Sequence, residues 1–157
     1  MTHEKKQEYT LRITQANPSA LVVINYEIFF DLIQEAKEYM SRGEKKEAVL
    51  SLDKAQQALN MLIDSLNMDQ DPAPAIYQVY LYVSAMLGRT RGSMKPELMD
   101  DPIRLMRSLY ETYKADSAGD DSSPVMDNSQ KVYAGLTYGK GTLSEDMSQD
   151  ASRGFFV

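Results

Sequence analysis

The sequence contains no cysteine, and its only histidine is His3. Without cysteine there is neither a disulfide framework nor a thiolate metal site, and a reducing compartment fits best. A single histidine in a polar segment excludes a Ser-His-Asp or Cys-His arrangement and argues against a histidine metal site. We therefore expect no enzyme activity and no catalytic, metal-binding or cofactor-binding residues.

Long apolar runs and phosphate-binding loops are also missing. No run of about 18 apolar residues occurs and the N-terminal segment is polar, so we expect neither a membrane span nor a signal peptide. Gly88 and Gly92 are not followed by Gly-Lys-Ser or Gly-Lys-Thr, so they form no phosphate loop. Acidic pairs such as Asp120 and Asp121 lack the ligand spacing of a calcium loop.

Basic residues are outnumbered by acidic ones, 17 to 23, which gives a net charge of −6. Nucleic-acid binding needs a basic surface that neutralises phosphates, so we expect a protein partner instead. The chain has ten methionines and ten tyrosines. Methionine adapts its shape and tyrosine combines an apolar body with a polar tip, which suits a binding surface, although most of these side chains also fit an ordinary core.

The first sixteen residues and the segment that follows them differ in pattern. Within residues 1–16 the apolar residues Tyr9, Leu11 and Ile13 alternate with polar ones, which indicates an extended arm lying on a surface. Asn17 followed by Pro18 is typical of a helix N-cap with proline in the first turn. We predict a helix from here to about residue 40, with an apolar arc of roughly 200° that must be covered on two sides.

Three further segments carry apolar residues at the spacing of three and four that packed helices show. They cover about residues 44–66, 76–88 and 101–115, and residues 95–99 are compatible with an extra helical turn. Short connections favour antiparallel neighbours. We therefore predict an all-α fold: an antiparallel four-helix bundle over residues 17–115, with an N-terminal arm and an extended C-terminal tail.

The tail begins with a linker. Residues 116–123 are rich in Asp, Ser, Gly and Ala and cannot bury apolar area. Beyond them the chain regains apolar residues, and we expect four of these to dock on the bundle: Val132, Tyr133, Leu136 and Tyr138. Such a tail is also a candidate to imitate a protein segment that the bundle binds, here called a client.

Apolar residues that the core does not use are candidates for binding a client. Three lie in the arm and seven project away from the predicted packing stripes: Tyr9, Leu11, Ile13, Val23, Phe30, Leu50, Met61, Tyr77, Leu81 and Tyr82. Scattered exposed apolar residues are also normal on soluble proteins, so the pattern alone favours a client groove and an ordinary surface about equally.

Several short motifs occur in the order found in one family. These are Tyr9 in the arm, Gln15-Ala16-Asn17-Pro18 with Leu21, Ile24-Asn25-Tyr26, Ala36-Lys37, Gly43-Glu44, Lys54-Ala55-Gln56, Ser65-Leu66-Asn67-Met68 and Ile76-Tyr77-Gln78-Val79-Tyr80-Leu81-Tyr82. Over about residues 9–115 the chain thereby resembles the FliS family of flagellin-specific secretion chaperones. It departs from the family pattern at Gln15, where threonine is usual, at Asn67 and Asp69 around the exit from the second helix, and at Tyr113, where tryptophan is usual. The tail is also longer.

The resemblance implies a cytoplasmic helical bundle that takes part in bacterial flagellum assembly. It implies binding of the C-terminal segment of flagellin, protection of flagellin against premature polymerisation, and delivery to the flagellar type III export gate. It also implies that the client can displace the arm from the bundle. A disordered client that folds into amphipathic helices needs long apolar grooves, which agrees with the composition.

A second reading remains open on the residues alone. A helical scaffold or dimerisation adaptor would use the same apolar stripes for self-association. A stable dimer that is indifferent to flagellin is the observation that distinguishes it from a chaperone.

Overall fold

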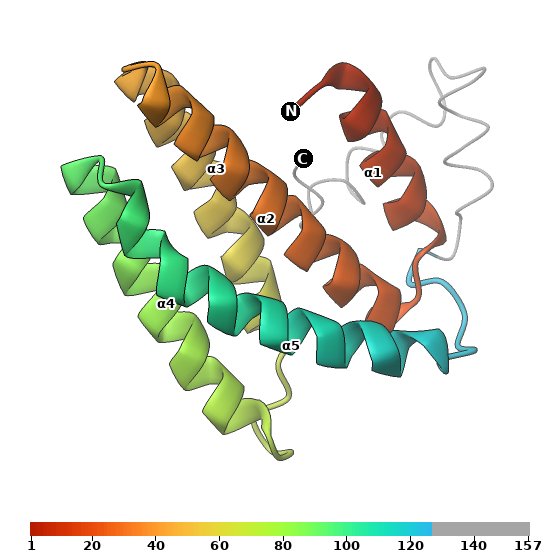
Figure 1. Ribbon diagram of the computed structural model, residues 1–157. Coiled ribbons are helices and arrows are strands. Elements are labelled where there is room, and N and C mark those ends of the chain that lie inside the picture. Colours follow the sequence, from red (N-terminus) through yellow and green to blue (C-terminus); the bar gives the residue numbers. More distant parts are fainter. Residues whose placement is uncertain (127–157) are drawn as a thin grey trace.

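The computed structural model describes residues 1–126, and all of the secondary-structure elements in this range are helices (Figure 1). The elements in chain order are α1 (His3–Gln15), α2 (Pro18–Ser41), α3 (Lys45–Asp64), α4 (Ala73–Ser93), the 3₁₀ turn η1 (Pro96–Met99) and α5 (Asp100–Ala118). No strand occurs within residues 1–126. The predicted all-α bundle is confirmed.

The long helix α2 begins and ends where the sequence indicates. The Asn17 side chain accepts a hydrogen bond of 2.9 Å from the Ala20 amide, and Pro18 occupies the first turn. At the other end Gly43 takes a φ of +73°, a left-handed conformation that favours glycine and turns the chain into α3. The two helices then run side by side in opposite directions (Figure 1).

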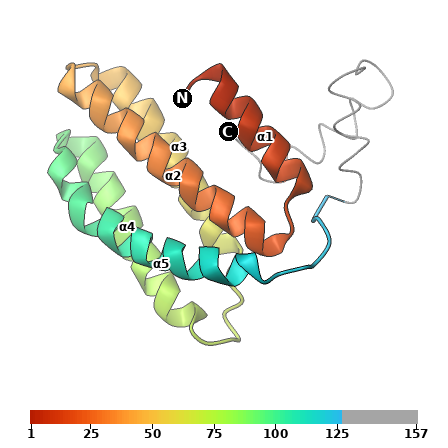
Figure 2. The same ribbon diagram turned by 45° about the vertical axis from the view of Figure 1, so that its right-hand side comes forward.

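The second hairpin is formed by α4 and α5 and is less parallel than the first. The two helices meet near the η1 turn and diverge towards the N-terminal end of α4 and the C-terminal end of α5, as both views show (Figures 1 and 2). Along its length α5 also packs on α2. The core between these helices includes the fully buried side chains of Tyr26, Phe29, Ile33, Leu52, Leu59, Leu62, Tyr80, Val83 and Met106.

The predicted extended arm is wrong, because residues 3–15 form helix α1, which lies against α2 on the side away from α4 (Figure 1). Thr2 caps this helix by accepting a hydrogen bond from the Lys5 amide. Tyr9 and Ile13, four residues apart, share one face and are both buried, whereas Leu11 points outward and is 37% exposed. The alternating pattern therefore consists of two residues on the buried face of a helix, Tyr9 and Ile13, and one exposed residue, Leu11.

The C-terminal end of the bundle also differs from expectation. Helix α5 continues to Ala118, beyond the predicted end at residue 115, and the extra helical turn that the sequence suggested at residues 95–99 is the 3₁₀ turn Pro96–Met99. After α5 the chain turns back to the junction of α1 and α2, where the Val125 amide donates a hydrogen bond of 2.9 Å to the Ala16 carbonyl. Within residues 1–126 every helix is too short or too polar to cross a membrane.

Candidate functional site

An apolar groove lies where α4 and α5 diverge. The N-cap residue of α4, three residues in its first two turns and four residues of α5 line it: Pro72, Ala75, Ile76, Val79, Leu109, Thr112, Tyr113 and Asp116. The groove has a volume of about 350 Å³. Asp116 is its one ionisable carboxylate, at the end of α5. An apolar channel between two splayed helices has the form that an amphipathic helix needs for docking.

Tyrosines join this groove to the core of the bundle. The ring of Tyr113 lies 5.7 Å from that of Tyr26, measured between centroids. The hydroxyls of Tyr26 and Tyr80 are 2.5 Å apart and form a buried hydrogen bond between α2 and α4. Burial raises the pKa of all three tyrosines, so they are neutral at physiological pH. Tyr113 thus gives the groove an uncharged aromatic side chain that connects it to the buried tyrosines of the core.

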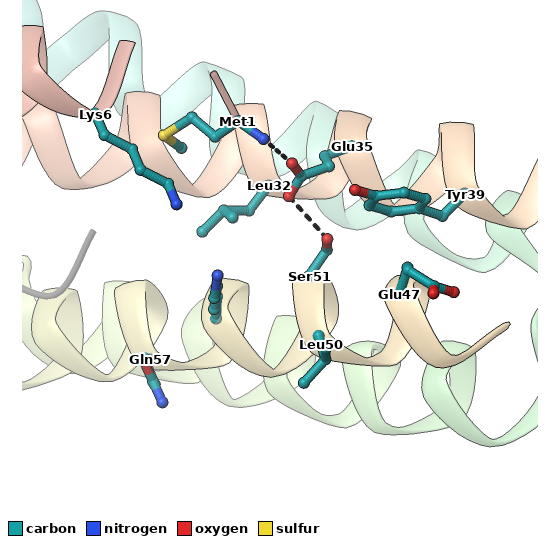
Figure 3. A pocket seen from close by; sticks show the side chains of 10 residues that line it. Met1, Lys6, Leu32, Glu35, Tyr39, Glu47, Leu50, Ser51 and Gln57 are labelled. Carbon is teal, nitrogen blue, oxygen red and sulfur yellow. Dashed lines mark hydrogen bonds and ion pairs between the residues drawn. The ribbon is translucent and has the colours of Figure 1, made fainter. Parts of the chain in front are cut away.

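A second groove runs between α2, α3 and the start of α1, with a volume of about 320 Å³ (Figure 3). Leu32, Tyr39 and Leu50 supply its apolar surface. Its polar side is mixed, because Lys6 and Lys54 face it together with Glu35 and Glu47. The Glu35 carboxylate accepts a hydrogen bond of 2.8 Å from Ser51 and forms an ion pair with the amino group of Met1. This groove suits a segment that carries both apolar and charged side chains.

Several polar pairs join α1 to α2. The Tyr9 hydroxyl donates a hydrogen bond of 2.5 Å to Asp31, which also pairs with Lys5 at 2.9 Å. Arg12 pairs with Glu27 at 2.6 Å, and Tyr110 donates to the same carboxylate at 3.0 Å. Burial is the main reason that the pKa of Tyr9 is raised, so its hydroxyl remains a donor. These polar pairs supplement the buried side chains of Tyr9 and Ile13 in attaching α1.

The structure does not gather the predicted client-binding residues into one site. Leu50 lines the second groove and is 55% exposed. Leu81 and Tyr82 are exposed on α4, and Tyr82 donates a hydrogen bond to Asp101 of α5. Leu11 is exposed on α1, while Met61 and Tyr77 are half-buried on α3 and α4. These residues are spread over three helices and two faces of the molecule.

Other predicted contacts are covered by the chain itself. Tyr9, Ile13 and Val23 are buried. Phe30 is half-buried, packs edge-on against Tyr110, and has the Arg107 guanidinium 4.4 Å above its ring. The four predicted docking residues of the tail lie outside the described residues: Val132, Tyr133, Leu136 and Tyr138.

Sequence reasoning missed the lining of the α4/α5 groove. Ile76, Val79, Leu109 and Tyr113 were assigned to the packing stripes of their helices, and their spacing fits that role. Whether such a stripe is filled depends on the angle at which the neighbouring helix crosses, and periodicity carries no information on that angle. One available hint was the Asp71-Pro72-Ala73-Pro74 segment, which fixes the start of α4 at one end of the groove.

The described residues offer no sign of a metal centre. Within residues 1–126 no three His, Cys, Asp or Glu side chains come close enough together to hold a metal ion. In the second groove, Glu35 is engaged by the Ser51 hydroxyl and by the amino group of Met1. What the surfaces offer chemically is the burial of apolar side chains, with charged groups at the edges.

Comparison with known proteins adds the family. The model of the flagellar protein FliS matches residues 1–119, which is all of the helical part described above. No curated protein and no solved structure matches the chain. The family match covers three quarters of the sequence and agrees with the order of motifs from Tyr9 to Tyr82. The chain belongs to the FliS family of flagellar proteins, which implies a role as a flagellar chaperone rather than an enzyme.

Proposed function

We propose that this protein is a cytoplasmic export chaperone that binds the C-terminal segment of flagellin. In this role it keeps flagellin from polymerising early and delivers it to the flagellar type III export apparatus. The observation that carries the proposal is the open apolar groove between α4 and α5 in a member of the FliS family. An unfolded client gains its binding energy by folding an apolar helix face into such a groove.

The dimensions and chemistry of the groove support a helical client. Its walls come from two helices, and the side chains that face it are mainly aliphatic or aromatic. A helix in this groove buries apolar surface at roughly 25 cal/mol per Å², which offsets the ordering of a disordered segment. Asp116 at one end favours a client residue that is neutral or basic at that position.

The remaining exposed apolar residues are candidates for the rest of the client. The second groove, which Leu50 lines, lies between α2 and α3, whereas the first lies between α4 and α5. A client of two or more helical segments can occupy both grooves and so bind more tightly than either segment alone. Lys6, Lys54, Glu35 and Glu47 then select the charges of the segment in the second groove.

Calorimetric titration with a peptide from the C-terminus of flagellin tests the proposal. Ala75 and Ala85 are both exposed on α4, but only Ala75 lines the groove. We expect the wild-type chain and Ala85→Glu to bind the peptide with similar affinity. Ala75→Glu places a charge in the apolar groove and is expected to bind at least about tenfold more weakly.

Two results contradict the proposal in different ways. Absence of heat with the wild-type chain at high micromolar peptide rules out the client. Binding that is weakened by Ala85→Glu and not by Ala75→Glu moves the site to the outward face of α4, where Leu81 stands one turn from Ala85.

A further inference from the structure

The segment that follows α5 is fastened to the junction between α1 and α2. Asn17 donates from its amide nitrogen to the Asp120 carbonyl at 3.1 Å and to the Ser122 carbonyl at 3.4 Å. The Ser19 hydroxyl donates to the Asp120 carboxylate, and the Val125 amide donates to the Ala16 carbonyl at 2.9 Å. Residues 120–125, here called the strap, therefore contact both sides of this junction.

The bonds of the strap are local and specific. Within the strap, the Ser122 amide donates to the Asp120 carboxylate at 2.9 Å, which fixes the turn that presents Asp120 to Ser19. Hydrogen bonds from Ser122 and Ser19 lower the pKa of Asp120 to about 2, so the carboxylate is charged at every physiological pH. The strap thus contributes a charged carboxylate, Asp120, that accepts hydrogen bonds from Ser19 of α2 and from the Ser122 amide.

Asn17 has two separate tasks in this arrangement. Its side-chain oxygen caps α2 by accepting from Ala20, and its side-chain nitrogen holds the strap. A serine or aspartate caps a helix equally well but has no amide nitrogen to donate. The cap of α2 and the strap can therefore be separated by mutation.

Helix α1 depends on this junction because it has few other apolar contacts. Its buried apolar side chains are Tyr9 and Ile13, followed by Ala16 at its C-terminal cap. The other attachments are the charged pairs of Lys5, Arg12 and the amino terminus with α2, which water and salt can replace. The direction in which α1 leaves α2 is set by the short connection at Ala16 and Asn17, and the strap bonds both of these residues.

We propose that residues 120–125 form a strap that holds α1 closed on α2, so that the segment leading into the C-terminal tail controls the release of α1. The chain passes the end of α1 at Val125. A force or a binding partner that draws the following residues away acts first on the bond between Val125 and Ala16. Release of the strap frees the junction to rotate and lets α1 leave the surface that it covers.

Hydrogen–deuterium exchange of the full chain, read by mass spectrometry, tests the strap without any client. It is therefore independent of the proposed function. Asp120→Ala removes the acceptor for Ser19 and Ser122, and Asn17→Asp keeps the helix cap but places a carboxylate against the carbonyls of Asp120 and Ser122. In both variants we expect amides of α1 to exchange about tenfold faster, while those of α3 keep their wild-type rates.

The neighbouring acidic residue provides a matched control. Asp121 is exposed, and Asp121→Ala changes the charge by the same amount one position away. It should leave the exchange of α1 as in the wild type. Ser19→Ala removes a single hydroxyl, and we expect the amides of α1 to exchange roughly threefold faster in this variant. This milder change keeps the test valid if Asp120→Ala or Asn17→Asp unfolds the protein. Unchanged α1 rates in the strap variants, or equal acceleration in Asp121→Ala, overturn the proposal.

Discussion

The hydroxyls of Tyr26 and Tyr80 illustrate how single residues fix the packing of this bundle. Both side chains have no exposed surface, and their oxygens are 2.5 Å apart. Each hydroxyl has the other as its partner, so the pair sets the register of α2 against α4. Removing the Tyr80 hydroxyl leaves that of Tyr26 buried without water and without a protein partner, whereas Tyr80 also has a hydrogen bond with Tyr113.

This pairing predicts strong non-additivity. We expect Tyr26→Phe and Tyr80→Phe each to lower the free energy of unfolding by about 1–2 kcal/mol, because each change removes the buried hydrogen bond between α2 and α4. The double variant should cost clearly less than the sum of the two. Urea denaturation of the four proteins measures this cycle. Tyr82→Phe on the exposed side of α4 serves as a control, with a change within about 0.5 kcal/mol; additive losses in the cycle contradict the account.

At the scale of residues, the helical period identified much of the core. Tyr26, Phe29 and Ile33 follow one another at intervals of three and four residues, as a packed helical face requires, and they are fully buried. Side chains off that stripe were not predictable in the same way. Phe30 was expected on the surface, but α5 brings Tyr110 and Arg107 against it. The environment of Phe30 depends on a helix that lies about 80 residues further along the chain.

At the scale of elements, α1 shows where a short pattern misleads. Three apolar residues at alternate positions fit a strand-like arm, while Tyr9 and Ile13 alone fit a helix. The capping residue Thr2 is the signal that distinguishes the two. The long helices were predictable because caps, proline and period agree at each of their ends.

Helix α4 carries a glycine that its own fold does not require. Gly88 lies within the helix and is exposed, and a Cβ atom there meets nothing within 4 Å. We expect Gly88→Ala to raise the free energy of unfolding by about 0.5–1 kcal/mol, since alanine loses less backbone freedom on folding. Gly43→Ala is the opposite control, because φ is +73° there and a side chain is strained. A thermal or urea melt checks both signs, and a loss of stability at Gly88 contradicts the account.

The grooves belong to the arrangement of elements and not to any one of them. The α4/α5 groove exists because the two helices diverge from the η1 turn (Figure 2). The sequence predicts the helices and the short connection between them, but the pattern of apolar residues does not predict the angle at which the helices cross. A binding site made by that angle therefore emerges only in three dimensions.

For the whole molecule, buried tyrosines predict a stability limit at alkaline pH. The pKa values of Tyr9, Tyr26 and Tyr80 are raised above the ordinary value, chiefly by burial. Unfolded tyrosine ionises near pH 10, so these groups favour the folded state fully below about pH 10 and progressively less above it. We expect the urea midpoint to be steady near neutral pH and to fall above about pH 10.

The double variant Tyr26→Phe with Tyr80→Phe isolates this effect. Lysines and arginines titrate alike in both proteins, so only the tyrosine contribution differs. The midpoint of the double variant should fall less steeply with pH than that of the wild type. Parallel curves for the two proteins show that these tyrosines do not set the alkaline limit.

The tail provides a second prediction at this scale. If Val132, Tyr133, Leu136 and Tyr138 imitate the client, a chain that ends at residue 126 should bind the flagellin peptide more tightly. The cut keeps the strap, since Val125 and its bond to Ala16 remain. Calorimetry on the shortened and full chains measures the ratio of affinities. Equal affinities remove the idea that the tail competes with the client.

The claim that two diverging helices in this flagellar protein hold an incoming helix is tested most directly by nuclear magnetic resonance. Amide signals of the isotope-labelled chain are followed while unlabelled flagellin C-terminal peptide is added. We expect the largest changes at Ala75, Val79, Leu109 and Thr112, which face the groove. Saturated binding with those four signals unmoved contradicts the account.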